Sequence, residues 1–268
     1  MSECVFYELN KDYEDVCLVS VKSFLNHNDL DIYVYCINFI DYDFKNRIES
    51  LSKRIHVVFY NVSTQLKCMG CFNEIIDVIS AKFYIFNELL ERYDSVLYID
   101  DDVLIRKNIS GLFAYTDGIY GCNDCTEYSY LTDSRKTFFR RFKSNTQTYI
   151  NAGFLLVNNY NFDLEHYKDV IHKYGFRYPE QDYLNLLPHN VMDLKYCGNH
   201  YCGNADIDFY TFHYFGERKP FFCMEEVNDI TKHIKYIDEY FNVAKSISSL
   251  LTTKFVSNVE KNFRLQSS

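Results

Sequence analysis

Three consecutive aspartates in the middle of the chain have the spacing that most directly suggests chemistry. Residues 96–99 form an apolar run typical of a buried strand, and Asp100, Asp101 and Asp102 follow at once. Because side chains alternate along extended backbone, we expect Asp100 and Asp102 to face one way and Asp101 the other. Two carboxylates on one side repel each other, and a hard divalent cation between them would relieve that repulsion. A solvated acidic turn is the alternative for so short a motif.

Length and composition predict one globular α/β unit. The chain has 268 residues, of which 47% are hydrophobic and 24% charged, and no Pro-, Gly- or Ser-rich linker divides it. We expect a main domain over residues 1–224 and a helical extension over residues 225–268. The net charge of -9 argues against broad nucleic-acid binding, which needs a basic surface.

The N-terminal residues show no secretory signal, and no run of about 18 apolar residues predicts a transmembrane helix. Ten cysteines without an export signal indicate reduced thiols, and hence a cytoplasmic protein.

Strand and helix patterns alternate along the first hundred residues. Such alternation predicts parallel pairing, with ligands bound beyond the carboxyl ends of the strands. The apolar runs and helical periodicities predict strands at residues 5–9, 32–39, 56–60, 96–99, 118–122, 149–158 and 209–215, and helices at 13–26, 42–51, 74–91, 160–174, 179–187 and beyond 225.

Several other residues have both a structural and a chemical interpretation. Lys82 is either a solvated lysine or a cation beside phosphate. His213 lies in an aromatic strand, where a packed core histidine is commoner than a metal ligand. Glu180 and Asp182 stand at a predicted helix start, where acids are favourable in any case. Small residues at 151–153 would let a ligand approach the backbone.

Four segments in fixed order together resemble the retaining glycosyltransferases of family 8, the glycogenin and bacterial galactosyltransferase type. They are YIDDDV at 98–103, NAGFLLVN at 151–158, EQDYLN at 180–185 and HYFGERKPF at 213–221. Each is weak alone, whereas four in order are specific. The resemblance covers roughly residues 5–222.

This resemblance implies a GT-A nucleotide-diphospho-sugar transferase fold, a Rossmann-like mixed sheet flanked by helices, here with a C-terminal helical extension. It implies a UDP-sugar donor, UDP-glucose or UDP-galactose, and retention of configuration. It also implies Mn²⁺, with Mg²⁺ as the alternative, held by Asp100, Asp102 and His213. A mixed set of imidazole and carboxylate ligands suits Mn²⁺.

The remaining donor contacts are likewise implied by the resemblance. We expect Leu9, Asn10 and Tyr13 at the base, with the ring of Tyr13 stacked on uracil. Asp101 should reach the ribose, and Lys82, Gly216 and Lys219 should meet the diphosphate. The donor sugar should be surrounded by Asn151, Ala152, Glu180, Gln181, Asp182 and Asp124. Among these, the candidates for a direct catalytic role are Gln181, Asp182, Asn151 and Lys82.

The chain departs from the family pattern at two positions. Glu180 stands where the family has aspartate, which puts the sugar preference in question. Phe221 stands where the family usually has tryptophan, and the chain contains no tryptophan.

Three alternatives stay open. Structural zinc is suggested by two CxxC pairs, Cys68/Cys71 and Cys122/Cys125, and a later cluster of Cys197, His200 and Cys202. The protein could also bind a UDP-sugar without transferring it, or glucosylate its own tyrosines as glycogenin does. The acceptor, whether saccharide, protein or lipid-linked, and association into a homodimer are equally open.

Overall fold

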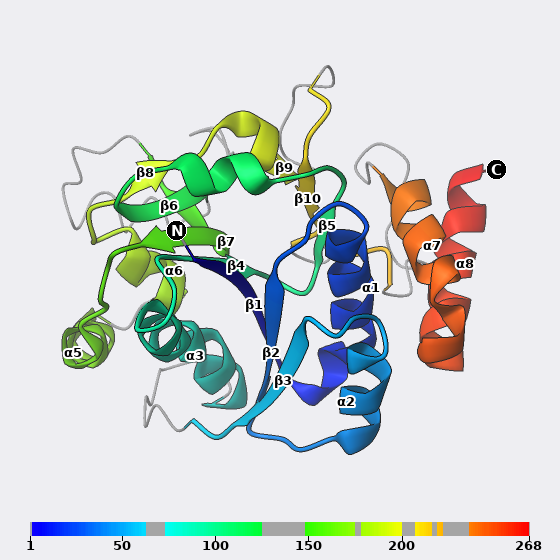
Figure 1. Cartoon of the computed structure of the whole chain (residues 1–268), viewed down its shortest axis with the longest axis horizontal. Coiled ribbons are helices and arrows are strands. Elements are labelled where there is room, and N and C mark those ends of the chain that lie inside the picture. Colours follow the sequence, from blue (N-terminus) through cyan, green and yellow to red (C-terminus); the bar gives the residue numbers. More distant parts are fainter. Residues whose placement is uncertain are drawn as a thin grey trace.

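The computed structural model describes residues 2–62, 73–124, 148–174, 178–199, 207–215, 219–221 and 236–267. Its centre is a seven-stranded sheet in the order β3-β2-β1-β4-β7-β6-β8 (Figure 1). The strands are β1 (Glu3–Leu9), β2 (Asp31–Ile37), β3 (Ile55–Tyr60), β4 (Ser95–Ile99), β6 (Gly118–Asn123), β7 (Ile150–Asn158) and β8 (Asn190–Val191). The first four run parallel, and β7 is antiparallel to both of its neighbours. The expected mixed sheet is therefore confirmed.

A second, three-stranded sheet carries the residues that follow the aspartates. It consists of β5 (Val103–Ile105), β10 (Thr211–His213) and β9 (Gly198–Asn199), in the order β5-β10-β9. The strand predicted at 209–215 is shorter than expected. The strand ends at His213, although the N–H of Tyr214 still donates to the carbonyl of Asp102, the residue opposite it.

Helices cover both faces of the large sheet (Figure 1). One face carries α1 (Glu14–Leu25) and α2 (Tyr42–Glu49), and the other carries α3 (Asn73–Leu90), α5 (Leu164–Tyr174) and α6 (Pro179–Leu184). The helix predicted from residue 160 begins at Leu164 instead. Residues before it are held extended, since Phe162 exchanges two hydrogen bonds with the Asn87 side chain and Asp163 accepts from the His166 N–H.

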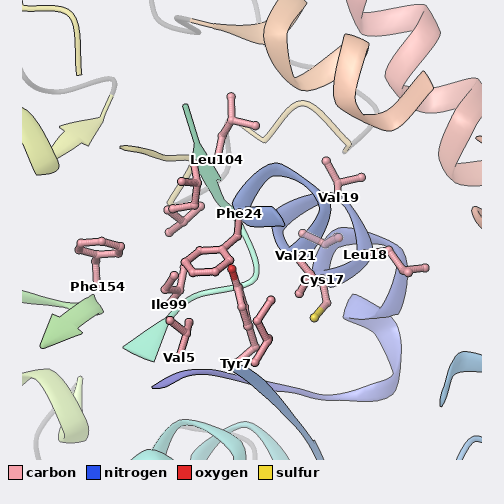
Figure 2. Close-up of a cluster of buried hydrophobic side chains, with 14 of the residues drawn as sticks. Val5, Tyr7, Cys17, Leu18, Val19, Val21, Phe24, Ile99, Leu104 and Phe154 are labelled. Atoms are coloured by element: carbon pink, nitrogen blue, oxygen red, sulfur yellow. The ribbon is translucent and has the colours of Figure 1, made fainter. Parts of the chain in front are cut away.

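Alternation along β1 divides the interior into two cores. Val5 and Tyr7 point towards α1, whereas Phe6 points towards α3. Figure 2 shows the first core, in which Val5 and Tyr7 meet Ile99 of β4 and Phe24 of α1. Strand alternation thus gives β1 two buried faces.

The C-terminal residues form two helices rather than one, α7 (Ile237–Ser246) and α8 (Thr253–Ser267). They lie side by side, with α7 against α1 (Figure 1). The two helices are separated at Thr252, whose N–H and hydroxyl both donate hydrogen bonds to the Asp15 carboxylate, at 3.2 and 2.5 Å. No helix among the described residues is both long enough and apolar enough to cross a membrane.

Candidate functional site

Asp100, Asp102 and His213 come together where β4 ends and the small sheet begins. His213 Nε2 lies 3.4 Å from Asp100 Oδ2 and 3.0 Å from Asp102 Oδ1. One ligand atom from each of the three residues lies within 4.8 Å of the others. We call this group the metal corner. It is the arrangement expected of ligands around one cation.

The backbone at the metal corner is a turn, and the expected extended path through the aspartates is wrong. The N–H of Val103 bonds the carbonyl of Asp100 at 3.1 Å, which closes the turn. The separation of faces nevertheless holds. Asp101 lies on the α1 side beside Cys17, where burial raises its pKa well above the usual range.

Gly153 of β7 makes room for the metal corner. Its carbonyl accepts the N–H of Asp100 at 2.8 Å, so the two backbones lie in direct contact. A Cβ at this position would overlap the Asp100 carboxylate and the His213 ring. Only glycine therefore lets both ligands occupy their present places.

The charges at the metal corner fit a bound cation. Burial disfavours an imidazolium, but the charge of Asp102 and hydrogen bonds to both aspartates outweigh it and raise the pKa of His213 to about 9. Burial likewise opposes the Asp102 carboxylate, yet the charges of His213 and Lys219 bring its pKa below the usual range. The carboxylates thus require positive charge between them, and a divalent ion can replace the imidazolium proton in supplying it.

Lys219 and Tyr13 extend the metal corner on one side. Lys219 Nζ lies 2.5 Å from Asp102 Oδ2 and donates to the Tyr13 hydroxyl at 3.2 Å. Asn10 accepts the Asp12 N–H at 3.1 Å and thereby caps η1 (Lys11–Tyr13), the short turn that carries Tyr13. Leu9, at the end of β1, is buried. Gly216 lies outside the described residues.

Hydrogen bonds of the Gln181 amide connect Asn151, Ala152 and Asp124, a group that we call the amide side. Gln181 Oε1 accepts from the Ala152 N–H at 3.1 Å and from Asn151 Nδ2 at 3.2 Å. Its Nε2 donates to Asp124 Oδ2 at 3.0 Å. Asp182 faces away from this network, because its Oδ1 accepts the Tyr149 hydroxyl at 2.5 Å.

A cavity of about 260 Å³ lies between the metal corner and the amide side. Its walls come from α3, α6, β7, β10 and the turn that follows β4. The lining residues are Ile79, Lys82, Asp100, Asn151, Ala152, Gly153, Tyr178, Glu180, Gln181, His213 and Phe215. Glu180 Oε2 is buried and has no hydrogen-bond partner among the residues that the structure describes, and burial raises the pKa of this carboxyl. Its oxygen is available to accept a ligand hydroxyl.

Lys82 is buried at this cavity and is not a solvated lysine. Its Nζ donates to the Ala152 carbonyl at 3.3 Å, lies 3.6 Å from Glu8 Oε1 and stands 4.3 Å from the centre of the Tyr98 ring. Burial opposes the ammonium, but Glu8 and Asp100 outweigh it and raise the pKa of Lys82. Burial raises the pKa of Glu8 to about 8, despite the charge of Lys82.

Sequence reasoning missed Glu8 and Tyr98. Tyr98 donates a short hydrogen bond to Asp100 Oδ1 and so orients this ligand. Glu8 stands at a buried position of β1, and a charged residue inside an apolar strand was the signal that could have identified it.

The cysteines do not all remain reduced thiols, so that expectation is wrong for one pair. Cys122 at the end of β6 and Cys197 after η4 (Leu194–Tyr196) form a disulfide, with Cα atoms 5.1 Å apart. Cys4, Cys17 and Cys36 are buried free thiols. The other cysteines of the zinc alternative, together with His200, lie outside the described residues.

Comparisons with known proteins identify solved structures with the same fold. The structure resembles the galactosyltransferase LgtC, crystallised with donor and acceptor sugar analogues, with a TM-score of 0.70 and 17% identity over 96% of this chain and 99% of LgtC. It also resembles the bifunctional glycosyltransferase WbbM, with a TM-score of 0.69 and 18% identity, over the whole of this chain and 52% of WbbM. These likenesses establish a GT-A fold.

Sequence comparison identifies a relative in the uncharacterized protein R707 of Acanthamoeba polyphaga mimivirus. It is 25% identical over 245 residues, which span 80% of this chain and 76% of R707. The model for glycosyl transferase family 8 matches residues 4–265. The chain therefore belongs to glycosyltransferase family 8.

Proposed function

We propose that the protein is a retaining, Mn²⁺-dependent hexosyltransferase that moves glucose or galactose from a UDP-sugar to an acceptor. Membership of family 8 supports glycosyl transfer in general. The observation that carries the finer proposal is the joining of two carboxylates and one imidazole beside a cavity lined by lysine, acid and amide side chains. An ion at this corner would act as a Lewis acid on the departing diphosphate.

In this proposal one set of residues binds the nucleotide part of the donor and another binds its sugar. Lys219 and Lys82 face the diphosphate and stabilise the charge that develops on it. The ring of Tyr13 covers the uracil, Leu9 and Asn10 lie at its edge, and Asp101 meets the ribose. Mg²⁺ is the alternative ion for Asp100, Asp102 and His213.

The amide side would hold the sugar. Gln181 lines the cavity, whereas the Asp182 carboxylate is taken up by Tyr149. We therefore place Gln181 and Asn151 against the hexose and assign Asp182 a supporting role. Glu180 would accept a hydroxyl of the sugar through its free oxygen. The amide and acid groups of this side can hydrogen-bond the hydroxyls of an uncharged hexose.

Release of UDP tests the proposal. The protein is incubated separately with UDP-glucose and UDP-galactose, in the presence of Mn²⁺ or of EDTA, and UDP and intact protein mass are measured together. We expect Mn²⁺-dependent release of UDP from one donor. A ladder of added hexoses would identify self-glucosylation, and release without a mass change would indicate another acceptor or hydrolysis. Binding of a UDP-sugar without any release would contradict the transferase proposal and favour a silent binding protein.

A further inference from the structure

The C-terminal helix α8 forms hydrogen bonds to residues 219–221, the short segment that contains Lys219. The side-chain amide of Asn262 donates to the carbonyl of Pro220 at 2.7 Å, and that of Asn258 donates to the carbonyl of Phe221 at 3.3 Å. The two asparagines are four residues apart and so lie on one face of the helix. Asn262 is fully buried. Two neighbouring backbone carbonyls are thus fixed by one helix.

Aromatic packing at Phe221 also holds the same segment. The Phe221 ring stacks on Phe255 of α8 at 6.0 Å and lies 6.1 Å from Tyr240 of α7. It also meets Tyr13 edge to face at 6.3 Å. The position of Phe221 therefore links the C-terminal helices to the residue expected to stack on the base.

The two C-terminal helices are also tied to α1, α2 and the residue after β5, independently of this segment. Arg106 Nε donates to Glu239 of α7 at 2.6 Å, and Arg47 donates to the Leu250 carbonyl, between the helices, at 2.8 Å. Thr252, immediately before α8, bonds Asp15. These contacts hold α8 in place without the help of residues 219–221, so α8 can act as a fixed support for them.

Lys219 directly precedes the two residues that α8 binds, and it contacts both Asp102 and Tyr13. A lysine side chain has four rotatable bonds, so fixing its backbone limits where the ammonium can lie. We propose that Asn262 is a positioning residue for Lys219, and that α8 is thereby a structural part of the donor site. The donor-binding part of this inference rests on the proposed function.

Chemical labelling tests the position of Lys219 without any nucleotide. Lysines are acylated under limiting reagent, and the rate at Lys219, measured by peptide mass spectrometry, is divided by that of exposed Lys11. We expect Asn262→Leu to raise this ratio about 2- to 10-fold, the range that one lost hydrogen bond gives. The matched control is Asn242→Leu, at an exposed position of α7, which should leave the ratio unchanged. An unchanged ratio in a folded Asn262→Leu protein would overturn the inference.

Asn258→Leu decides the question if Asn262→Leu does not fold. Its hydrogen bond is longer and its side chain only partly buried, so we expect a smaller rise in the same direction. No rise in this variant would likewise count against the inference.

A double-mutant cycle then tests the link to the donor. Asn262→Leu should weaken Mn²⁺-dependent UDP binding about 2- to 10-fold in the wild-type background and much less in a Lys219→Met background. Equal losses in both backgrounds would show that Asn262 does not act through Lys219. If the wild type bound no UDP, the proposed function would fail, whereas the labelling result would still decide the position of Lys219.

Discussion

The metal corner and the amide side are held together by different forces. At the metal corner, ionic groups stand 2.5–3.4 Å apart, with His213 and Lys219 set against Asp100 and Asp102. On the amide side, Gln181 joins its neighbours through hydrogen bonds of 3.0–3.2 Å, most of them between neutral groups. The first arrangement depends on charge balance and should respond to pH and metal. The amide side depends on the direction of its hydrogen bonds, so its function should respond mainly to the shape of the side chains there.

The largest effect is expected at the metal corner. Asp102→Asn removes one charged ligand and leaves His213 and Lys219 without their shared partner. Loss of residues that merely orient ligands typically lowers metal affinity 10–100-fold, so we expect a fall of at least about 100-fold in Mn²⁺-dependent UDP release. Asp117→Asn, at an exposed position, is the control. Near wild-type turnover by a folded Asp102→Asn protein would refute the assignment.

Gly153→Ala should affect the metal corner without changing its charge. The added methyl overlaps the Asp100 carboxylate and the His213 ring, so both ligands must move. We expect Mn²⁺ affinity, measured by calorimetry, to fall about 10- to 100-fold. Ala152→Gly, at the neighbouring position, is a control for changes in the strand itself. An affinity equal to that of the wild type would show that the ligands tolerate displacement.

Gln181→Ala should separate the two regions. The substitution leaves the Ala152 N–H and the Asp124 carboxylate without this partner, while the three metal-corner residues are untouched. We expect transfer or hydrolysis of the donor to slow at least about 10-fold, because three hydrogen bonds of Gln181 are lost, with unchanged Mn²⁺ affinity. The control Asn46→Ala lies on the exposed side of α2. A parallel loss of metal affinity would mean that the two regions are one coupled unit.

The two regions also differ in how far the sequence reveals them. Asp100 and Asp102 stand in a short local motif that already suggests a metal. His213 could be assigned to the same site because it begins the last of the four segments that carry the family resemblance. Contacts that arise only when distant elements pack left little local trace. Glu8 meets Lys82 across 74 residues, and Cys122 meets Cys197 across 75.

Local sequence patterns also predicted some ends of helices and strands wrongly. Alternation gave the correct faces for the three aspartates but the wrong backbone, because a hydrogen bond from Val103 closes a turn there. The strands and the alternation of the first hundred residues were predictable, since buried apolar runs leave a strong signal. Helix starts such as Leu164 were not, because a tertiary contact with Asn87 decides where the chain stays extended.

The smallest expected effect is a pH dependence of stability to which His213 of the metal corner contributes. In the folded, metal-free protein the pKa of His213 is about 9, above the value of about 6.5 for an unfolded chain. The stabilisation from its proton is therefore complete below pH 6.5 and is lost as pH rises through 9. In EDTA, the midpoint of thermal unfolding should fall by a few degrees between pH 7 and 9.5. His213→Asn should reduce this fall and leave the part that Glu8 contributes as pH rises through about 8, whereas Gln181→Ala should retain all of it. An equal slope in wild type and His213→Asn would show that other groups cause the dependence.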